Sequence, residues 1–131
     1  MNLAVYGSLM TSEGMLQRLG VEQMVRSLGP ATLPGQLFDL GDFPGLISGE
    51  GRVAGELLLV VNRAVIPILD DYEGCRPDSP ESSVFVRQQL RLIEPSVDAW
   101  VYLYNRPVAD RPRISGLSWP EYRVLRKGCP R

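Results

Sequence analysis

The hydrophobic positions along the first half of the chain predict short strands and one short helix. An apolar run at residues 3–6 predicts a strand, and apolar side chains within residues 15–19 predict a helix that ends at Gly20. The near-continuous apolar run at residues 53–61 is typical of a strand that is buried on both faces. The pattern therefore predicts a fold assembled from short elements.

Residues 21–28 carry two conflicting signals. Their apolar side chains recur with helical spacing, whereas the proline and glycine pairs within residues 29–35 favour a wandering edge strand. We interpret residues 32–39 as a strand and leave its boundaries open. Composition predicts a loop at residues 41–45 and a turn at residues 48–51.

The second half of the chain predicts a helix followed by a hairpin. The helix is expected to begin near Pro67, which is tolerated in a first turn, and to stop at Gly74. Residues 75–83 form a polar loop that contains prolines. Residues 84–93 alternate between apolar and polar side chains, and residues 99–104 alternate again, so the two runs predict an antiparallel pair.

Strands outnumber helices in this pattern, which predicts the α+β class with a mixed, largely antiparallel sheet. Six strands around one core would fit a compact β-barrel with a few short helices, but patterning alone leaves closure open. We expect one domain over residues 1–131, of which residues 105–131 form a less regular tail with a helical turn at residues 119–125.

The composition restricts the chemistry. The chain has no histidine, which excludes Ser–His and Cys–His nucleophile pairs and almost every catalytic zinc site. Proton transfer must then use a carboxylate, a tyrosine, a cysteine or water. The 14 basic and 15 acidic residues nearly balance, so charge gives no reason to expect a nucleic acid or membrane partner.

The two cysteines, Cys75 and Cys129, lie far apart and have no metal-binding spacing, so we expect free thiols, although a bridge between them stays open. The first residues lack the basic region of a signal peptide, and no stretch reaches the length of a membrane span. We therefore expect a soluble, cytoplasmic protein.

Glu73 is the first candidate for acid–base chemistry. It is expected at the C-terminal end of a helix, with Asp70 and Asp71 within one turn. The helix dipole, these two acids and burial would each raise the pKa of its carboxyl group, which could then act as base and as acid near neutral pH. The alternative interpretation is an acidic helix end in solvent.

The segment Tyr6-Gly7-Ser8-Leu9 is the second candidate. A strand that stops on a glycine turn leaves backbone N–H groups free to hold a carboxylate or the oxygen of a polarised carbonyl group. Gly7 can adopt a positive φ angle and let a ligand approach the backbone. Ser8 lacks a histidine that would activate it as a nucleophile, so its hydroxyl group is expected to stabilise the turn.

Three further side chains are candidates for contact with a ligand. Phe43 and Tyr102 would line a pocket or pack in the core. Arg87 would bind a substrate carboxylate or lie in solvent on the outer face of its strand.

Several segments in order resemble the gamma-glutamylcyclotransferase-like family, including its gamma-glutamylamine cyclotransferase branch. The likeness covers most of residues 3–104, and the end of the chain around Ile114-Ser115-Gly116 and Trp119 resembles small bacterial members. The segments that carry it are residues 5–9 (VYGSL), 40–45 (LGDFPG), 53–57 (VAGEL), 69–74 (LDDYEG) and 99–104 (AWVYLY).

The resemblance implies a compact mixed β-barrel fold in which the turn at residues 6–9 binds a glutamyl group and Glu73 is the acid and base. Members of the family cyclise a gamma-glutamyl amide, because the α-amine of the substrate attacks the γ-carbonyl carbon and releases 5-oxoproline and an amine or amino acid. No metal or cofactor takes part.

The chain departs from the family pattern at two places. Phe85 stands where the family often has a tyrosine, two residues before Arg87, which implies a lost substrate contact or a different leaving group. The loop at residues 75–83 is longer and richer in proline than expected. The rival hypotheses are a non-catalytic binding module that keeps the pocket and a plain interaction domain with exposed aromatic side chains.

Overall fold

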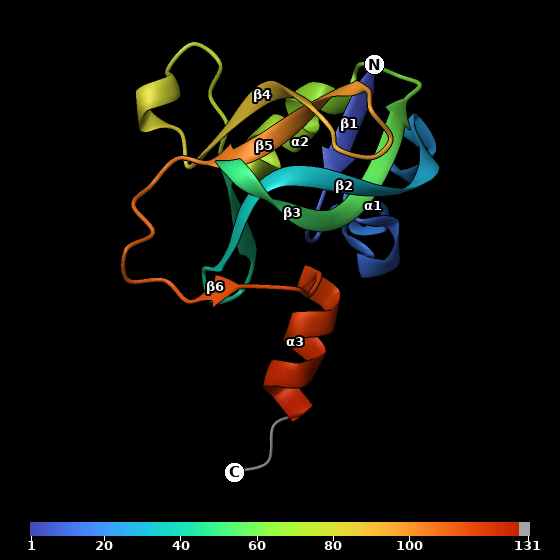
Figure 1. Ribbon diagram of the computed structural model, residues 1–131. Helices are drawn as coiled ribbons and strands as arrows, with labels where there is room; N and C mark the ends of the chain where they lie inside the picture. The colour runs from blue at the N-terminus through green and yellow to red at the C-terminus, as the bar shows by residue number, and fades with distance from the viewer. Residues whose placement is uncertain (129–131) are drawn as a thin grey trace.

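The first strand, β1 (Asn2–Val5), lies inside a six-stranded sheet of the computed structural model, which describes residues 1–128 (Figure 1). On one side β1 pairs antiparallel with β3 (Pro44–Val60), and on the other it pairs parallel with β5 (Asp98–Tyr104). The start of the chain is therefore held between two segments that follow much later in the sequence.

The remaining strands extend the sheet on both sides. They are β2 (Val25–Asp39), β4 (Phe85–Arg91) and β6 (Arg113–Ile114), and the strand order is β4-β5-β1-β3-β2-β6. All neighbours except β1 and β5 run antiparallel. The predicted α+β class with a mixed, largely antiparallel sheet is confirmed.

The sheet is curled but not closed, so the word barrel fits it only loosely. The described strand order ends at β4 on one side and at β6 on the other. One isolated bridge connects β2 to the segment after β4, through the N–H group of Thr32 and the carbonyl oxygen of Glu94 at 2.7 Å. A single bridge draws the two sides together without a continuous ladder between them.

The conflict at residues 21–28 is resolved in favour of the strand. A 3₁₀ helix, η2 (Glu22–Met24), precedes β2, which already pairs with β3 at Val25 and Val60. Partner strands supply backbone hydrogen bonds along β2, and this pairing outweighs the local helical spacing. A turn was predicted at residues 48–51, but these residues belong to β3. The pairing of β2 with β3 skips them near Gly35, so they bulge out of the ladder.

The helices are short; α2 (Val65–Glu73) lies behind β4 and β5 beside β1, and α3 (Trp119–Gly128) lies below the sheet (Figure 1). The helix expected near Pro67 begins at Val65, and Gly74 ends it with a φ angle of 66°. No helix within residues 1–128 is long and apolar enough to cross a membrane. The helical elements besides η2 are η1 (Thr11–Glu13), α1 (Met15–Arg18), α2 (Val65–Glu73), η3 (Pro80–Ser82) and α3 (Trp119–Gly128).

Two apolar clusters form the core, and the strands contribute alternate side chains to each. Leu3 and Val5 of β1 pack into the cluster that also contains Leu69 of α2. Ala4 packs into the other cluster, which contains the fully buried Trp119 of α3. The alternation predicted for residues 99–104 follows the same division, because their aromatic side chains contact the α2 cluster and their aliphatic side chains the α3 cluster.

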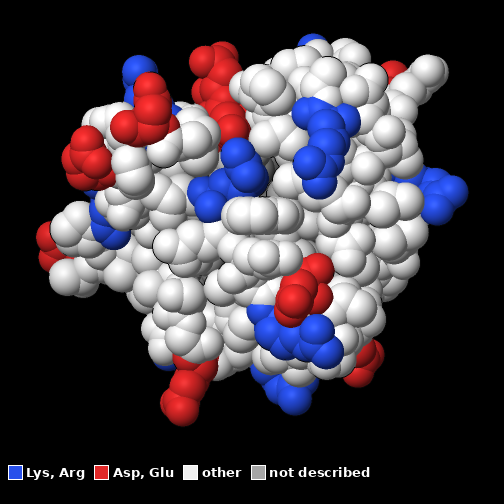
Figure 2. All heavy atoms as spheres, turned by 90° about the horizontal axis from the view of Figure 1, so that it is seen from above, with Lys and Arg blue, Asp and Glu red and all other residues white. Residues whose placement is uncertain are grey.

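Charged side chains are scattered over the face seen in Figure 2, where acidic and basic groups are mixed without an extended region of one sign.

The thiol of Cys75 is free, as predicted, and this residue is buried, whereas Cys129 lies outside the described residues. Burial raises the pKa of the Cys75 thiol above its ordinary value, which disfavours the reactive thiolate.

Candidate functional site

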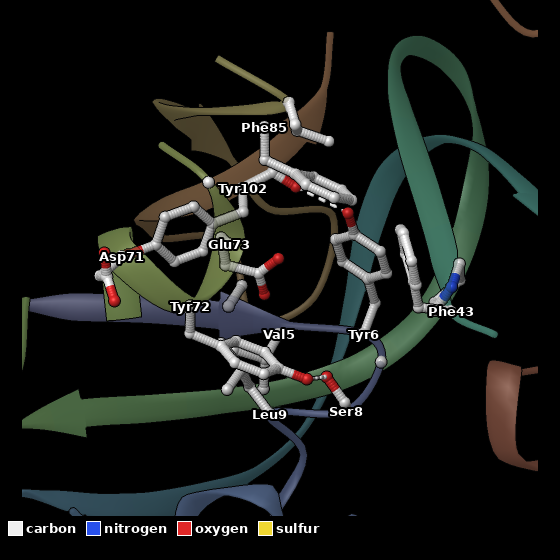
Figure 3. Close-up of a pocket in the computed structure, with 15 residues that line it drawn as sticks. Val5, Tyr6, Ser8, Leu9, Phe43, Asp71, Tyr72, Glu73, Phe85 and Tyr102 are labelled. Atoms are coloured by element: carbon white, nitrogen blue, oxygen red, sulfur yellow. Dashed lines mark hydrogen bonds between the residues drawn. The ribbon is translucent and has the colours of Figure 1, made fainter. Parts of the chain in front are cut away.

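A cavity of about 420 Å³ lies where the turn after β1 meets the end of α2 (Figure 3). The loop between β2 and β3 and the start of β4 complete its walls. Its lining residues come from segments far apart in sequence: Ala4, Val5, Tyr6, Gly7, Ser8, Leu9, Phe43, Pro44, Asp71, Tyr72, Glu73, Gly74, Val84, Phe85 and Tyr102. The structure therefore brings the two principal candidates from the sequence, the turn and Glu73, into one cavity.

Glu73 is the last residue of α2, and its carboxyl group points into the cavity (Figure 3). Burial raises the pKa of this group from 4.5 to about 7. The predicted direction of the pKa shift is confirmed, and burial, one of the three predicted causes, accounts for it. A carboxyl group with this pKa is available as both base and acid near neutral pH.

The turn at residues 6–9 lines the cavity and contains backbone N–H groups that have no backbone acceptor among the described residues. The N–H group of Met10 donates to the carbonyl oxygen of Gly7 at 3.0 Å, which closes the turn. The N–H groups of Gly7, Ser8 and Leu9 have no backbone acceptor within residues 1–128. Unpaired donors at a cavity wall are suited to bind a carboxylate or the oxygen of a polarised carbonyl group.

Gly7 is needed for space; the positive φ angle that a glycine allows is not adopted at this position. A Cβ atom at Gly7 would lie 2.8 Å from Cγ and 3.0 Å from Cδ of Pro44. The missing side chain thus allows the loop before β3 to approach the turn closely, which narrows the cavity on that side.

A buried glutamate anchors the chain just after the turn. Glu56 of β3 accepts hydrogen bonds from the backbone N–H group and the hydroxyl group of Thr11, both at 2.8 Å, and from the hydroxyl group of Ser27. Its side chain is thereby satisfied on the sheet side of the turn. These bonds fix the start of η1 and hence the exit of the turn from the cavity.

The hydroxyl group of Tyr6 is bound by the protein itself. It donates to the carbonyl oxygen of Tyr102 at 2.7 Å and accepts a hydrogen bond from the N–H group of Leu46 at 3.1 Å. Burial, together with the nearby Glu73 carboxyl group, raises the Tyr6 pKa far above its ordinary value. Tyr6 therefore lines the cavity with its ring while its hydroxyl group connects β1 to β5 and β3.

Arg87 lies outside the lining of this cavity, so the structure does not bring it to the expected substrate carboxylate. Its guanidinium group binds Asp70 through Nε and Nη2, each at 3.0 Å, and lies over the ring of Trp100. Tyr102 donates its hydroxyl group to the same carboxylate at 2.7 Å. Asp70 thus joins α2 to β4 and β5, directly before the turn of helix that carries Glu73.

The remaining predicted side chains, Ser8 and Phe43, lie in the cavity wall. The hydroxyl group of Ser8 is 2.8 Å from that of Tyr72, so the two bridge the turn and α2 (Figure 3). Phe43 contacts Phe85, with 6.0 Å between the ring centroids, and keeps 41% of its surface exposed.

Sequence reasoning missed Asp71, Tyr72 and Val84 as lining residues and Asp70 as a partner of Arg87. Helical spacing could have predicted that Asp70 lies on the same helix face as Glu73, because the two residues are three positions apart. No feature of the neighbouring sequence predicts that Val84 lines the cavity, since Val84 borders a polar loop. Among the described residues, no group of three His, Cys, Asp or Glu side chains has the arrangement of a metal site.

The open, curled α+β sheet has the fold of a known family of proteins. The chain matches the family "Gamma-glutamyl cyclotransferase, AIG2-like" over residues 3–121. It is 31% identical over 120 residues to the gamma-glutamylcyclotransferase family protein YtfP of Escherichia coli K12, which covers 91% of this chain and 96% of the relative. The chain therefore belongs to the gamma-glutamylcyclotransferase family, and the resemblance seen in the sequence is confirmed.

Solved structures show the same fold. The solution structure of ytfP from Escherichia coli is 30% identical, with a TM-score of 0.63, and the match covers 94% of this chain and 99% of that one. An uncharacterized protein from Pyrococcus horikoshii has a TM-score of 0.67 over 100% of this chain and 99% of its own, at 15% identity, which shows likeness of fold alone.

Proposed function

We propose that this protein is a cyclotransferase that cleaves a gamma-glutamyl amide by ring closure of the glutamyl group. The observation that carries the proposal is the Glu73 carboxyl group, which has a pKa of about 7 and faces the cavity opened by the turn at residues 6–9. Family membership supports the same reaction class.

In the proposed reaction Glu73 accepts a proton from the α-ammonium group of the substrate. The freed amine then attacks the γ-carbonyl carbon, a new C–N bond forms, and the carbonyl oxygen takes the electron pair as an oxyanion. When that pair returns, the bond to the leaving nitrogen breaks and Glu73 gives its proton to that nitrogen. The Glu73 carboxylate then takes the second proton from the ring nitrogen and passes it to the released amine. The products are 5-oxoproline and an amine, and no electrons are gained or lost.

The protein would contribute position and charge stabilisation. The free N–H groups of Gly7, Ser8 and Leu9 would hold the glutamyl carboxylate or stabilise the oxyanion. Binding the substrate in a bent conformation supplies the high effective molarity of an intramolecular attack, which is worth ~7–11 kcal/mol in well-oriented cases. The substrate brings its own nucleophile, which suits a chain without histidine.

The test is to incubate the purified protein with gamma-glutamyl amides and to measure 5-oxoproline by chromatography. We expect the wild type to release it and Glu73→Gln to lose ~10²–10⁴-fold in kcat, because a glutamine side chain cannot shuttle the proton. The matched control is Glu81→Gln, the same change at an exposed position on η3 outside the cavity.

Full turnover by Glu73→Gln would exclude Glu73 as the acid and base. A wild type that releases no 5-oxoproline but melts at a higher temperature with a gamma-glutamyl compound would instead identify a binding module.

A further inference from the structure

One wall of the cavity is apolar although part of it faces solvent. Phe43 and Val84 keep 41% and 39% of their surfaces exposed and still line the cavity, next to Pro44 and the buried ring of Phe85. Figure 3 shows the Phe43 and Phe85 side chains beside the ring of Tyr6. We call Phe43, Pro44, Val84 and Phe85 the apolar wall. Exposed apolar side chains grouped at a cavity provide surface that an apolar ligand can cover.

Phe85 gives this wall no polar group. Its ring lies between those of Phe43 and Tyr104, with centroid distances of 6.0 and 5.3 Å. A tyrosine here would offer a hydroxyl group to a polar leaving group. A phenylalanine offers only dispersion contacts and the burial of apolar area, which favour a hydrocarbon surface.

The charges in the cavity are of one sign. Among the lining residues of the described chain, Asp71 and Glu73 are the charged side chains, and none is Arg or Lys. The free N–H groups of the turn are the donors available to an anion, and the glutamyl carboxylate would occupy them. A second carboxylate, on the leaving group, would find no cation and would approach two acids.

On the basis of the proposed function, we propose that the leaving group is an apolar amine without a carboxylate, which contacts Phe43 and Val84 of the apolar wall. The preferred substrates are then gamma-glutamyl amides of aliphatic or arylalkyl amines, and gamma-glutamyl peptides are poor substrates. Phe43 is the residue that sets this preference, because it is the most exposed ring of the wall.

A matched pair of substrates tests the preference. Gamma-glutamyl-phenethylamide and gamma-glutamyl-phenylalanine differ only by the carboxylate of the leaving group, and gamma-glutamyl-methylamide lacks the apolar part. We expect kcat/KM for the phenethylamide to exceed that for the phenylalanine compound by ~10-fold or more, because the unpaired carboxylate is disfavoured. We expect the methylamide to be poorer than the phenethylamide by ~10-fold as well, because it leaves the wall uncovered.

Variants at Phe43 test the assignment of the wall. Phe43→Ala is expected to reduce the ratio of phenethylamide to methylamide turnover, and Phe43→Leu to keep most of it. Phe43→Arg supplies the missing cation and is expected to shift the preference toward gamma-glutamyl-phenylalanine. The control is Leu28→Ala, which removes a similarly exposed apolar side chain outside the cavity and should leave both ratios unchanged.

The two proposals fail in different ways. Cyclisation of gamma-glutamyl-phenylalanine as fast as the phenethylamide would overturn the leaving-group assignment and leave the proposed function intact. If no compound is cyclised, the proposed function fails, and the same pair is then titrated into the wild type by calorimetry. Tighter binding of the phenethylamide would support the apolar wall, and equal affinities would overturn it.

Discussion

Glu73 illustrates how a functional group can reduce stability. Its carboxyl group sits in a cavity where burial disfavours the ionised form, and the pKa rises from 4.5 to about 7. In the unfolded chain the same group is fully hydrated and ionises at its ordinary pKa. Between these two pKa values the folded protein binds this proton more tightly than the unfolded chain does, so a rise in pH favours unfolding.

The free energy of unfolding should therefore contain a Glu73 contribution that falls as the pH rises from about 4.5 to about 7 and is constant above that range. The full shift corresponds to ~3 kcal/mol, and access of solvent to the cavity reduces it to ~1–2 kcal/mol. We expect Glu73→Gln to be more stable than the wild type at pH 8 by that amount.

Urea unfolding of both proteins at pH 4.5 and pH 8 checks this expectation. The lower pH is the internal control, because the protonated wild type resembles the variant there and the difference should shrink. A variant that is no more stable than the wild type at pH 8 would show that the Glu73 carboxyl group is well solvated.

A buried ion pair is one of the contacts that hold α2 on the sheet. Asp70 accepts two hydrogen bonds from Arg87 of β4 and one from Tyr102 of β5, one turn before Glu73. The Asp70 and Arg87 side chains are 9% and 18% exposed, so solvent screens their interaction little.

Removal of Arg87 should be costly, and a second arginine on the same strand offers a matched control. Arg87→Met leaves the buried Asp70 carboxylate with Tyr102 as its remaining donor, so we expect a loss of ~2–4 kcal/mol in the free energy of unfolding. Arg91→Met breaks the pair with Asp98, whose two side chains are 64% and 57% exposed, and should cost less than ~1 kcal/mol.

Both variants are compared with the wild type by chemical denaturation at one pH. Equal losses for the two variants would show that the Arg87 pair contributes no more than a surface contact.

The sequence predicted those elements whose pattern is local. A few neighbouring residues were enough to predict the strand at residues 99–104 and the end of the helix at Gly74. The structure confirms both. Residues 21–28 were ambiguous because the strand there is stabilised by partners in β3 that the local pattern cannot show. The bulge at residues 48–51 could not be predicted for the same reason, because it depends on the register between β2 and β3.

The candidate site was predictable in part for the same reason. Glu73 and the turn at residues 6–9 belong to compact motifs, whereas the place of Arg87 was decided by a partner in α2. The crowding of Gly7 against Pro44 depends on how closely a distant loop approaches the turn. Contacts of this kind follow from the arrangement of the sheet and not from composition or spacing.

The arrangement of the sheet was the least predictable feature. Residue patterns leave open which strands are neighbours, and the parallel pair of β1 and β5 joins Leu3 to Trp100, which lie far apart in the sequence. Further contacts connect α3 to the rest, since Trp119 is buried in the core and Tyr122 and Arg126 bind Asp39 at the end of β2. These contacts predict that α3 and the sheet unfold together.

The two tryptophans test this cooperativity, because Trp100 lies in the sheet and Trp119 in α3. Trp119→Phe leaves a reporter on β5, and Trp100→Phe leaves one on α3. In each variant we expect the urea midpoint from fluorescence to coincide with the midpoint of that variant from circular dichroism. A lower fluorescence midpoint in Trp100→Phe would show that α3 detaches before the sheet unfolds.

The central place of β1 also bears on how the protein emerges from a ribosome. The first strand leaves the exit tunnel early, but its β3 partner follows some fifty residues later and its β5 partner near residue 100. Until then its peptide groups have only solvent, or a chaperone, to bind. A nascent polypeptide arrested before β5 should therefore lack the hollow that Glu73 faces, because Tyr102 of β5 is part of its lining, and it would acquire that hollow only once synthesis is nearly complete.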